Sequence, residues 1–337
     1  MIIIQILLGG ITRLTGSGLS ITEWKPIMGT LPPMNEQAWN IAFDKYKEIA
    51  QYKYLNFHFD LQDFKFIFFW EWFHRLWARL IGVVFLVPFI IFLFQKRFKK
   101  GMVKPMIILF LLGALQGLVG WIMVQSGLDD SDALYVNHFK LAIHFILAIG
   151  LLCYVFWFAL DLLVPGNHFT INKSLRTFTI WLVAGLMLQL IYGAFMAGLK
   201  AAAAAPTWPS INGSWWPQNI HEFGNREFPG LTFLTDNPLV VHFIHRNLAY
   251  ILIILFLAWT WRAMKTQGSI WFNRTKWLPL IVILIQAILG ILTVLYAPDA
   301  RMMIWLGAAH QFTAMFLLLV LTWFIYIIRS KTFSHAI

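Results

Sequence analysis

Cysteine and charge are both scarce in this sequence. Its single cysteine, Cys153, lies within an apolar run, so the chain has neither a disulfide framework nor a cysteine metal site. Only 12% of its 337 residues are charged and 59% are hydrophobic, a balance that no soluble globular domain of this size needs to fill its core. The bilayer is therefore the expected solvent, and a large soluble domain is excluded.

Apolar runs long enough to cross a membrane recur along the chain. Spanning the hydrocarbon core takes about 20 residues of helix. Such runs lie at 66–94, 105–125, 138–164, 177–199, 239–261, 277–297 and 302–328. Residues 1–11 are also apolar but only about half the required length, and we interpret them as the end of a first helix. The sequence thus predicts an all-α integral membrane protein with eight transmembrane helices.

The net charge of +11 does not indicate nucleic acid, because the basic residues lie between apolar runs and not on a stripe interleaved with aromatic residues. They concentrate in three segments that follow alternate runs, 96–104, 173–176 and 262–276. By the positive-inside rule these segments face the cytoplasm, which places both termini there and the chain in a bacterial plasma (inner) membrane. The long segments 13–65 and 200–238 are then external and are expected to cover sites at the membrane surface.

Two patterns repeat between the halves of the chain. The odd-numbered runs each contain a glutamine followed four residues later by a glycine, and the pairs are Gln5/Gly9, Gln116/Gly120, Gln189/Gly193 and Gln286/Gly290. We interpret these pairs as a packing device, because glycine permits close helix approach and glutamine bonds across helices. The even-numbered runs repeat Glu71-Trp-Phe-His74-Arg75 as His242-Phe-Ile-His245-Arg246. Two four-helix bundles related by a pseudo-twofold axis are therefore predicted, over 1–164 and 177–328.

Each even-numbered run contributes one histidine within the membrane, namely His74, His144, His245 and His310. Ionisable residues are costly in lipid and are functional candidates there. All four lie about 6 to 9 residues from the external end of their run, roughly 9 to 14 Å deep. Two histidines on facing helices at equal depth suit axial ligation of a heme iron, so we predict that the first two and the last two form ligand pairs. Zinc fits less well, because imidazoles in separate bundles cannot converge on one ion.

Charged side chains accompany these histidines. Arg75 and Arg246 directly follow a histidine and could hold heme propionates, although snorkelling to lipid headgroups explains them equally well. Glu71, one helical turn before the first histidine, corresponds to His242 in the second half. A carboxylate beside a heme can act as a base or stabilise positive charge, whereas pairing with Arg75 or Arg79 is the structural alternative. The first half is thus the catalytic candidate and the second the electron relay.

Several segments together resemble the heme A synthase family. They are Gly9-Gly10-Ile-Thr12-Arg13-Leu-Thr15-Gly16-Ser-Gly18-Leu-Ser, Glu23-Trp24-Lys25-Pro26, Glu71-Trp-Phe-His74-Arg75, Gln116-Gly117-Leu-Val-Gly120-Trp121, Thr207-Trp208-Pro209 and His310-Gln311. The cysteine-free loop around 24–65 resembles the proteobacterial and mitochondrial branch. The sequence departs from the family pattern at Ala78, where glycine is usual, and at 201–205, where five alanines replace a more polar segment.

This resemblance implies oxidation of a methyl group of heme O, through hydroxylated forms, to the formyl group of heme A for terminal oxidase assembly. It implies heme O as substrate in the first half and a resident heme b in the second, with Arg13, Arg79 and Trp208 among the residues that bind heme. It further implies homo-oligomers, contact with the prenyltransferase that makes heme O, and oxidase assembly factors as partners.

Two rival functions use part of the same pattern. A diheme b-type electron carrier that oxidises a quinol would need the four histidines but would not explain a glutamate in only one half. A transporter would explain the repeat but not the matched histidines.

Overall fold

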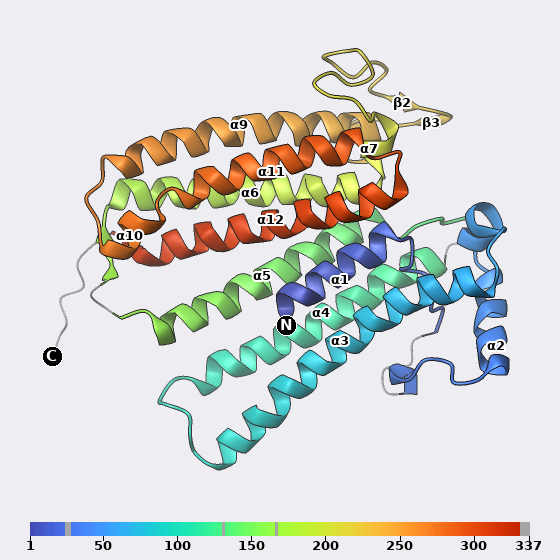
Figure 1. The fold of residues 1–337 in the computed structure, drawn as a ribbon, viewed down its shortest axis with the longest axis horizontal. Helices are drawn as coiled ribbons and strands as arrows, with labels where there is room; N and C mark the ends of the chain where they lie inside the picture. Colours follow the sequence, from blue (N-terminus) through green and yellow to red (C-terminus); the bar gives the residue numbers. More distant parts are fainter. Residues whose placement is uncertain (24–27, 130–131, 166–167, 331–337) are drawn as a thin grey trace. The chain divides into compact units, whose positions relative to one another are not determined.

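The computed structural model describes residues 1–23, 28–129, 132–165 and 168–330 (Figure 1). Seven of the described helical segments are long and apolar enough to cross a membrane. They are α3 (Leu61–Phe94), α4 (Val103–Leu128), α5 (His138–Leu163), α6 (Lys173–Gly198), α9 (Pro238–Met264), α12 (Ala300–Ile327) and the segment Ile270–Leu295, which joins α10 (Ile270–Thr275) to α11 (Leu278–Leu295). This confirms the prediction of an all-helical, multi-pass membrane protein.

The first helix, α1 (Ile2–Leu14), has 13 residues and is too short to span the bilayer. Within its described part the chain therefore has seven candidate spans, and the eighth remains a prediction. Most spans start and end within a few residues of the predicted runs, and the largest differences are the early starts of the segment Ile270–Leu295 and of α3. Helix α3 begins at Leu61, because Asp60 caps its first turn and Asp63 completes a capping box. His74 consequently lies about three and a half turns into its helix, further from the helix start than expected.

The chain forms two compact units, and the first, Met1–Leu151, contains a helical lid over the start of α3. The lid comprises η1 (Met28–Thr30), α2 (Glu36–Lys47) and η2 (Tyr52–Asn56). It packs on α3 through one buried apolar cluster, whose members are Phe43, Tyr46, Phe64, Ile67 and Phe68. Burial raises the pKa of Tyr46 to about 12, so its phenol stays protonated and donates a 3.0 Å hydrogen bond to Gln51 Oε1.

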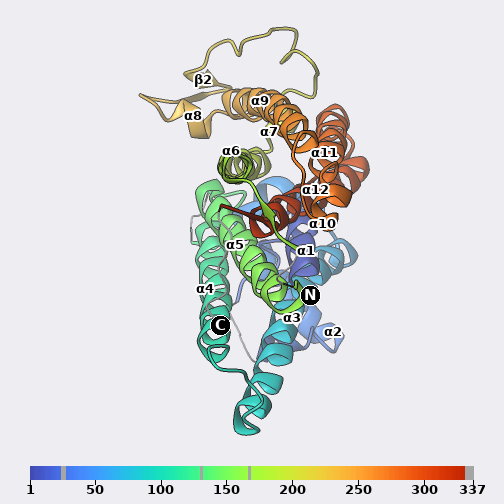
Figure 2. The same cartoon turned by 90° about the vertical axis from the view of Figure 1, so that its left-hand side faces the viewer.

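The second unit, Leu152–Ile337, contains a closed four-helix bundle. Contacts link α6 to α9, α9 to α11, α11 to α12 and α12 back to α6, and the four helices run alongside one another (Figures 1 and 2). Trp259, near the end of α9, is fully buried, and its Nε1 donates a 2.9 Å hydrogen bond to Thr179 Oγ1 near the start of α6. The pseudo-twofold relation between this bundle and the first unit remains a prediction.

Short strands and the end of α5 complete the second unit. A parallel pair joins β1 (Thr170–Ile171) to β4 (Ile328–Arg329), and an antiparallel pair joins β2 (Glu222–Phe223) to β3 (Arg226–Glu227). The boundary between the units falls inside α5, earlier than the boundary after residue 164 that the sequence suggested. Side chains at the end of α5 explain this position, since the ring of Trp157 packs edge-on against Tyr326 of α12.

Candidate functional site

Each of the four histidines lies against a glutamine and a glycine of a neighbouring helix. Gln189 Nε2, on α6, lies 3.0 Å from the carbonyl oxygen of His245 and 3.3 Å from its ring Nε2. One turn further along α6, a Cβ added to Gly193 would lie 3.3 Å from Cε1 of the same ring. The repeated Gln and Gly therefore share one function in this helix pair: they contact the histidine.

The second unit brings two of the predicted ligands together. The imidazole centroids of His245 on α9 and His310 on α12 lie 6.5 Å apart. Two imidazoles that each place a nitrogen about 2 Å from a shared metal have ring centres roughly 6 Å apart, so the spacing fits an iron between them. Among the described residues, Nδ1 of each ring is buried without a hydrogen-bond partner. The pair therefore has a ring separation that suits a shared metal, and each ring keeps one nitrogen without a hydrogen-bond partner.

An arginine without a carboxylate partner lies beside this pair. Arg246 is 9% exposed, and its Nε and Nη1 find no hydrogen-bond partner in the described part of the chain. His242, one turn earlier on α9, is also buried, with an unpartnered Nδ1. Buried guanidinium groups are usually paired with an anion, so this position fits a ligand carboxylate such as a heme propionate.

The first unit holds the other predicted pair, His74 on α3 and His144 on α5. Gln116 Nε2 lies 2.9 Å from the carbonyl oxygen of His144 and 3.1 Å from its Nδ1. Gln5 Nε2 donates a 3.2 Å hydrogen bond to the carbonyl oxygen of His74. Each unit thus contains two of the four histidines, and the second unit places its two rings 6.5 Å apart.

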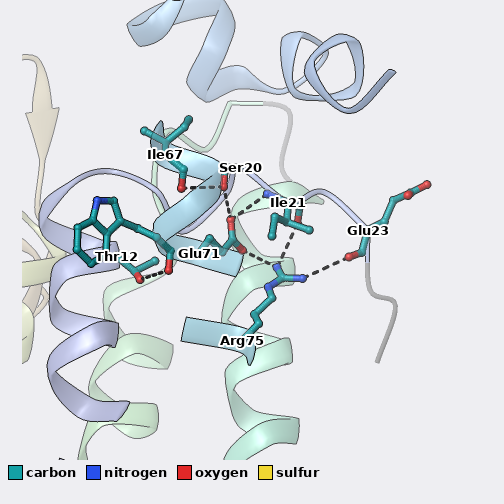
Figure 3. A network of polar contacts seen from close by, with 8 residues as sticks. Thr12, Ser20, Ile21, Glu23, Ile67, Glu71 and Arg75 are labelled. Carbon is teal, nitrogen blue, oxygen red and sulfur yellow. Dashed lines mark hydrogen bonds and ion pairs between the residues drawn. The ribbon is translucent and has the colours of Figure 1, made fainter. Parts of the chain in front are cut away.

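Glu71 lies at the centre of a polar network that includes Ser20, Ile21 and Arg75 (Figure 3). Its side chain is almost fully buried, and Oε1 forms a 2.5 Å ion pair with Arg75 Nη2. Oε2 accepts hydrogen bonds of 2.7 Å from Ser20 Oγ and 2.9 Å from the backbone N–H of Ile21. Arg75 also donates to the carbonyl oxygens of Ile21 and Glu23. The carboxylate and the guanidinium together anchor the segment that follows α1 to α3.

The chain turns tightly between α1 and this network. Thr12 Oγ1 contacts the carbonyl oxygen of Trp70 at 3.2 Å, which ties the end of α1 to α3. Gly16 has φ +69°, a conformation that favours glycine and reverses the chain after the helix. Leu19 is buried, and a Cβ on Gly127 of α4 would come within 2.8 Å of it. These residues bring Ser20 to Glu71.

Comparison with known proteins identifies the family. The model for the family described as cytochrome oxidase assembly protein (COX15-CtaA) matches residues 1–322. The chain belongs to this family. It is 38% identical over 331 residues to the heme A synthase of Flavobacterium johnsoniae, which covers 96% of this chain and 93% of that protein. It is 39% identical over 326 residues to the heme A synthase of Parvibaculum lavamentivorans, covering 97% and 90% respectively.

The structure also describes the other residues that the sequence predicted to bind heme. Arg13 lies in the last turn of α1, and its Nη1 is buried without a hydrogen-bond partner in the described ranges. Arg79 lies one turn beyond Arg75 on α3. Trp208 is 43% exposed, and its Nε1 donates a 2.9 Å hydrogen bond to the hydroxyl of Tyr250, one turn beyond Arg246 on α9. Trp24, Lys25 and Pro26 lie outside the described residues.

Sequence reasoning missed two features of this site. Ser20 closes the Glu71 network, and the only signal for it was its place at the end of the Gly9-to-Ser20 segment. The glutamines were assigned to helix packing alone, although their spacing of four residues from a glycine already placed both on one helix face. The structure adds what that face contacts, which is a histidine in every case.

Proposed function

We propose that this protein is a heme A synthase, which oxidises a methyl group of heme O to the formyl group of heme A. The observation that carries the proposal is an asymmetry between the units: each has two of the histidines, but among the described residues only the first has a buried carboxylate beside them. The naming of the family's curated relatives supports the same activity. A diheme electron carrier, the rival function, would need no such asymmetry.

The histidine pairs are assigned to two hemes. His74 and His144 would hold heme O in the first unit, and His245 and His310 would hold heme b in the second. Heme b, when bound, supplies one-electron transfer. The unpartnered Nδ1 atoms in the second unit and the 6.5 Å ring separation support that pair as a resident site.

The arginines divide into two kinds. Arg246 has buried donors without partners in the described ranges, so we assign it a heme propionate. Arg13, whose Nη1 is buried without a hydrogen-bond partner among the described residues, is the corresponding candidate in the first unit. Arg79, one turn beyond Arg75 on α3, is proposed to bind heme because of its place on that helix and the family resemblance. Arg75 already donates to Glu71 and two backbone carbonyls, which favours anchoring over propionate binding. Trp208 would act through its bond to Tyr250, by holding the external segment over α9.

Glu71 is the proposed catalytic carboxylate. Turning a methyl into a formyl with water as the oxygen source adds one oxygen to the carbon and releases four protons and four electrons, which an external electron acceptor must take up. A fixed negative charge near that carbon would stabilise positive charge that develops there. Ser20, Ile21 and Arg75 hold the carboxylate in one orientation. Because the carboxylate is already oriented, it need not rearrange during the reaction. Burial strengthens its electrostatic interaction with a developing positive charge.

Heme analysis tests both the function and the role of Glu71. The protein is produced together with a heme O-forming prenyltransferase in a host without its own heme A, and extracted pigments are separated by chromatography. We expect heme A from the natural sequence, and heme O or a hydroxylated form with little heme A from Glu71→Gln. Glu36→Gln, at an exposed carboxylate on α2, is the control and should behave like the natural sequence.

The two possible failures of this experiment are distinguishable. If the natural sequence converts no heme O, the proposed function is wrong. If Glu71→Gln makes normal amounts of heme A, only the catalytic assignment of Glu71 is wrong, and its place in the network is structural.

Location and partners form the finer part of the proposal. We infer a bacterial plasma membrane, α1 as the end of an eighth span, two pseudo-twofold-related bundles and cytoplasmic termini. The protein would receive heme O from the prenyltransferase, deliver heme A toward oxidase assembly factors and form homo-oligomers. Cysteine introduced at the exposed Asn219 should be labelled by an impermeant reagent from outside the cell, and labelling only after the cytoplasmic face is opened would reverse the topology.

A further inference from the structure

We propose that Gln5, Gln116, Gln189 and Gln286 are positioning residues that fix the ligand histidines of the two hemes. This inference rests on the proposed function, because it assigns each glutamine a role toward a heme ligand. Nothing in the helix-packing role predicted from sequence requires the glutamine to meet a histidine. The structure shows that contact in four separate helix pairs.

The geometry around Gln189 shows how one amide can fix a ring. The amide nitrogen carries two hydrogens, and it lies within reach of both the carbonyl oxygen and the ring Nε2 of His245. The Gln189 side chain therefore links the His245 imidazole to the His245 backbone and restricts rotation of the ring. The ring also packs closely against Gly193, because a Cβ added to this glycine would almost touch the imidazole.

The other pairs repeat this arrangement with small differences. Gln116 contacts both the carbonyl oxygen and the ring of His144, and Gln286 Nε2 lies 3.2 Å from the ring Nε2 of His310. A Cβ on the glycine one turn later would lie 2.7 Å from the His144 ring and 3.0 Å from the His310 ring. Gln5 is the exception, because its printed contact is with the carbonyl oxygen of His74 alone. Four repeats at four ligand positions argue against accidental packing.

A second observation points to a ligand role. The amide oxygen Oε1 of all four glutamines is buried and has no hydrogen-bond partner among the described residues. A metal-bound imidazole carries its proton on the other ring nitrogen and usually donates it to a nearby acceptor, which orients the ring and tunes the metal. Rotation of the amide about its last bond would turn its oxygen toward that proton, and this new bond would replace the one that its nitrogen makes to the histidine carbonyl. The unpartnered oxygens are therefore suited to the heme-bound state.

The test compares two substitutions in the same helix pair of the intact protein. Gln189→Leu removes the amide from the His245 ring, whereas Thr179→Val removes a different buried hydrogen bond between α6 and α9, the one to Trp259. Purified proteins are compared by the rate of heme transfer to apomyoglobin and by the low-spin electron paramagnetic resonance spectrum. We expect roughly 10- to 100-fold faster heme loss and shifted g values in Gln189→Leu. Thr179→Val should change neither readout, even if both variants lose thermal stability.

Gln286→Leu provides a second, independent variant and should shift the same spectrum through His310. If both leucine variants match Thr179→Val in heme loss and g values, the glutamines only pack helices and the inference is wrong. If the natural sequence binds no heme, the proposed function itself is wrong, and this inference falls with it.

Discussion

At the scale of single residues, the site depends on close contact between glycine and imidazole. The sequence predicted the four histidines and the Gln and Gly pairs from composition, spacing and repetition. It could not predict that the pairs meet the histidines, because which helix faces which depends on tertiary packing. The sequence likewise left two alternative roles open for Glu71. Only the structure shows that Arg75, Ser20 and the backbone N–H of Ile21 all bond to its carboxylate.

A glycine substitution tests the contact in the first unit. Gly120→Ala would place a Cβ 2.7 Å from Cε1 of His144, so the ring must move. We expect weaker heme binding in the first unit, measured by titrating heme into purified protein. Gly117→Ala is the matched control on the same helix, because nothing lies within 4 Å of its added Cβ. Equal heme affinity in the two variants would contradict the role assigned to Gly120.

At the scale of elements, the apolar runs predicted approximately where the membrane spans begin and end. They did not predict the helices of the lid. Its composition indicated a cover, yet α2 and its docking on α3 arise from aromatic contacts between residues far apart in sequence. Phe64 is fully buried in this cluster and stacks on Phe43 with ring centroids 5.0 Å apart. Because that partner lies about twenty residues away in a polar, helical stretch, hydrophobic runs alone could not place it.

Removing this contact should loosen the lid without unfolding the membrane part. Phe64→Ala is expected to cost about 3 to 5 kcal/mol locally, as buried aromatic truncations do. Hydrogen exchange of residues 36–56 in nanodiscs should rise, while exchange in α6 and α9 stays unchanged. Phe66→Ala, on the same helix at a side chain 55% exposed, should leave the lid protected. Unaltered exchange in Phe64→Ala would show that the lid is held by other contacts.

At the scale of the whole molecule, the chain divides into two units, and each contains two of the four histidines. The proposed function therefore predicts that each unit can bind its heme without the histidines of the other. His310→Ala should remove the heme of the second unit and leave heme binding by the first intact, as measured by optical titration and pigment extraction. His168→Ala, at a ring stacked on Trp271 in the same unit, should retain both hemes. Loss of both hemes from His310→Ala would contradict independent sites.

The length of α3 has a mechanical consequence. The helix is continuous from Leu61 to Phe94, and its internal proline, Pro88, lies beyond His74 on the side away from the lid. Phe64, which packs against the lid, and His74 are about 15 Å apart along this uninterrupted stretch. No proline lies between them, so this part of α3 is expected to move as one rigid rod. A displacement of the lid that carries Phe64 and the start of α3 with it would therefore also tilt the imidazole of His74, the proposed heme ligand.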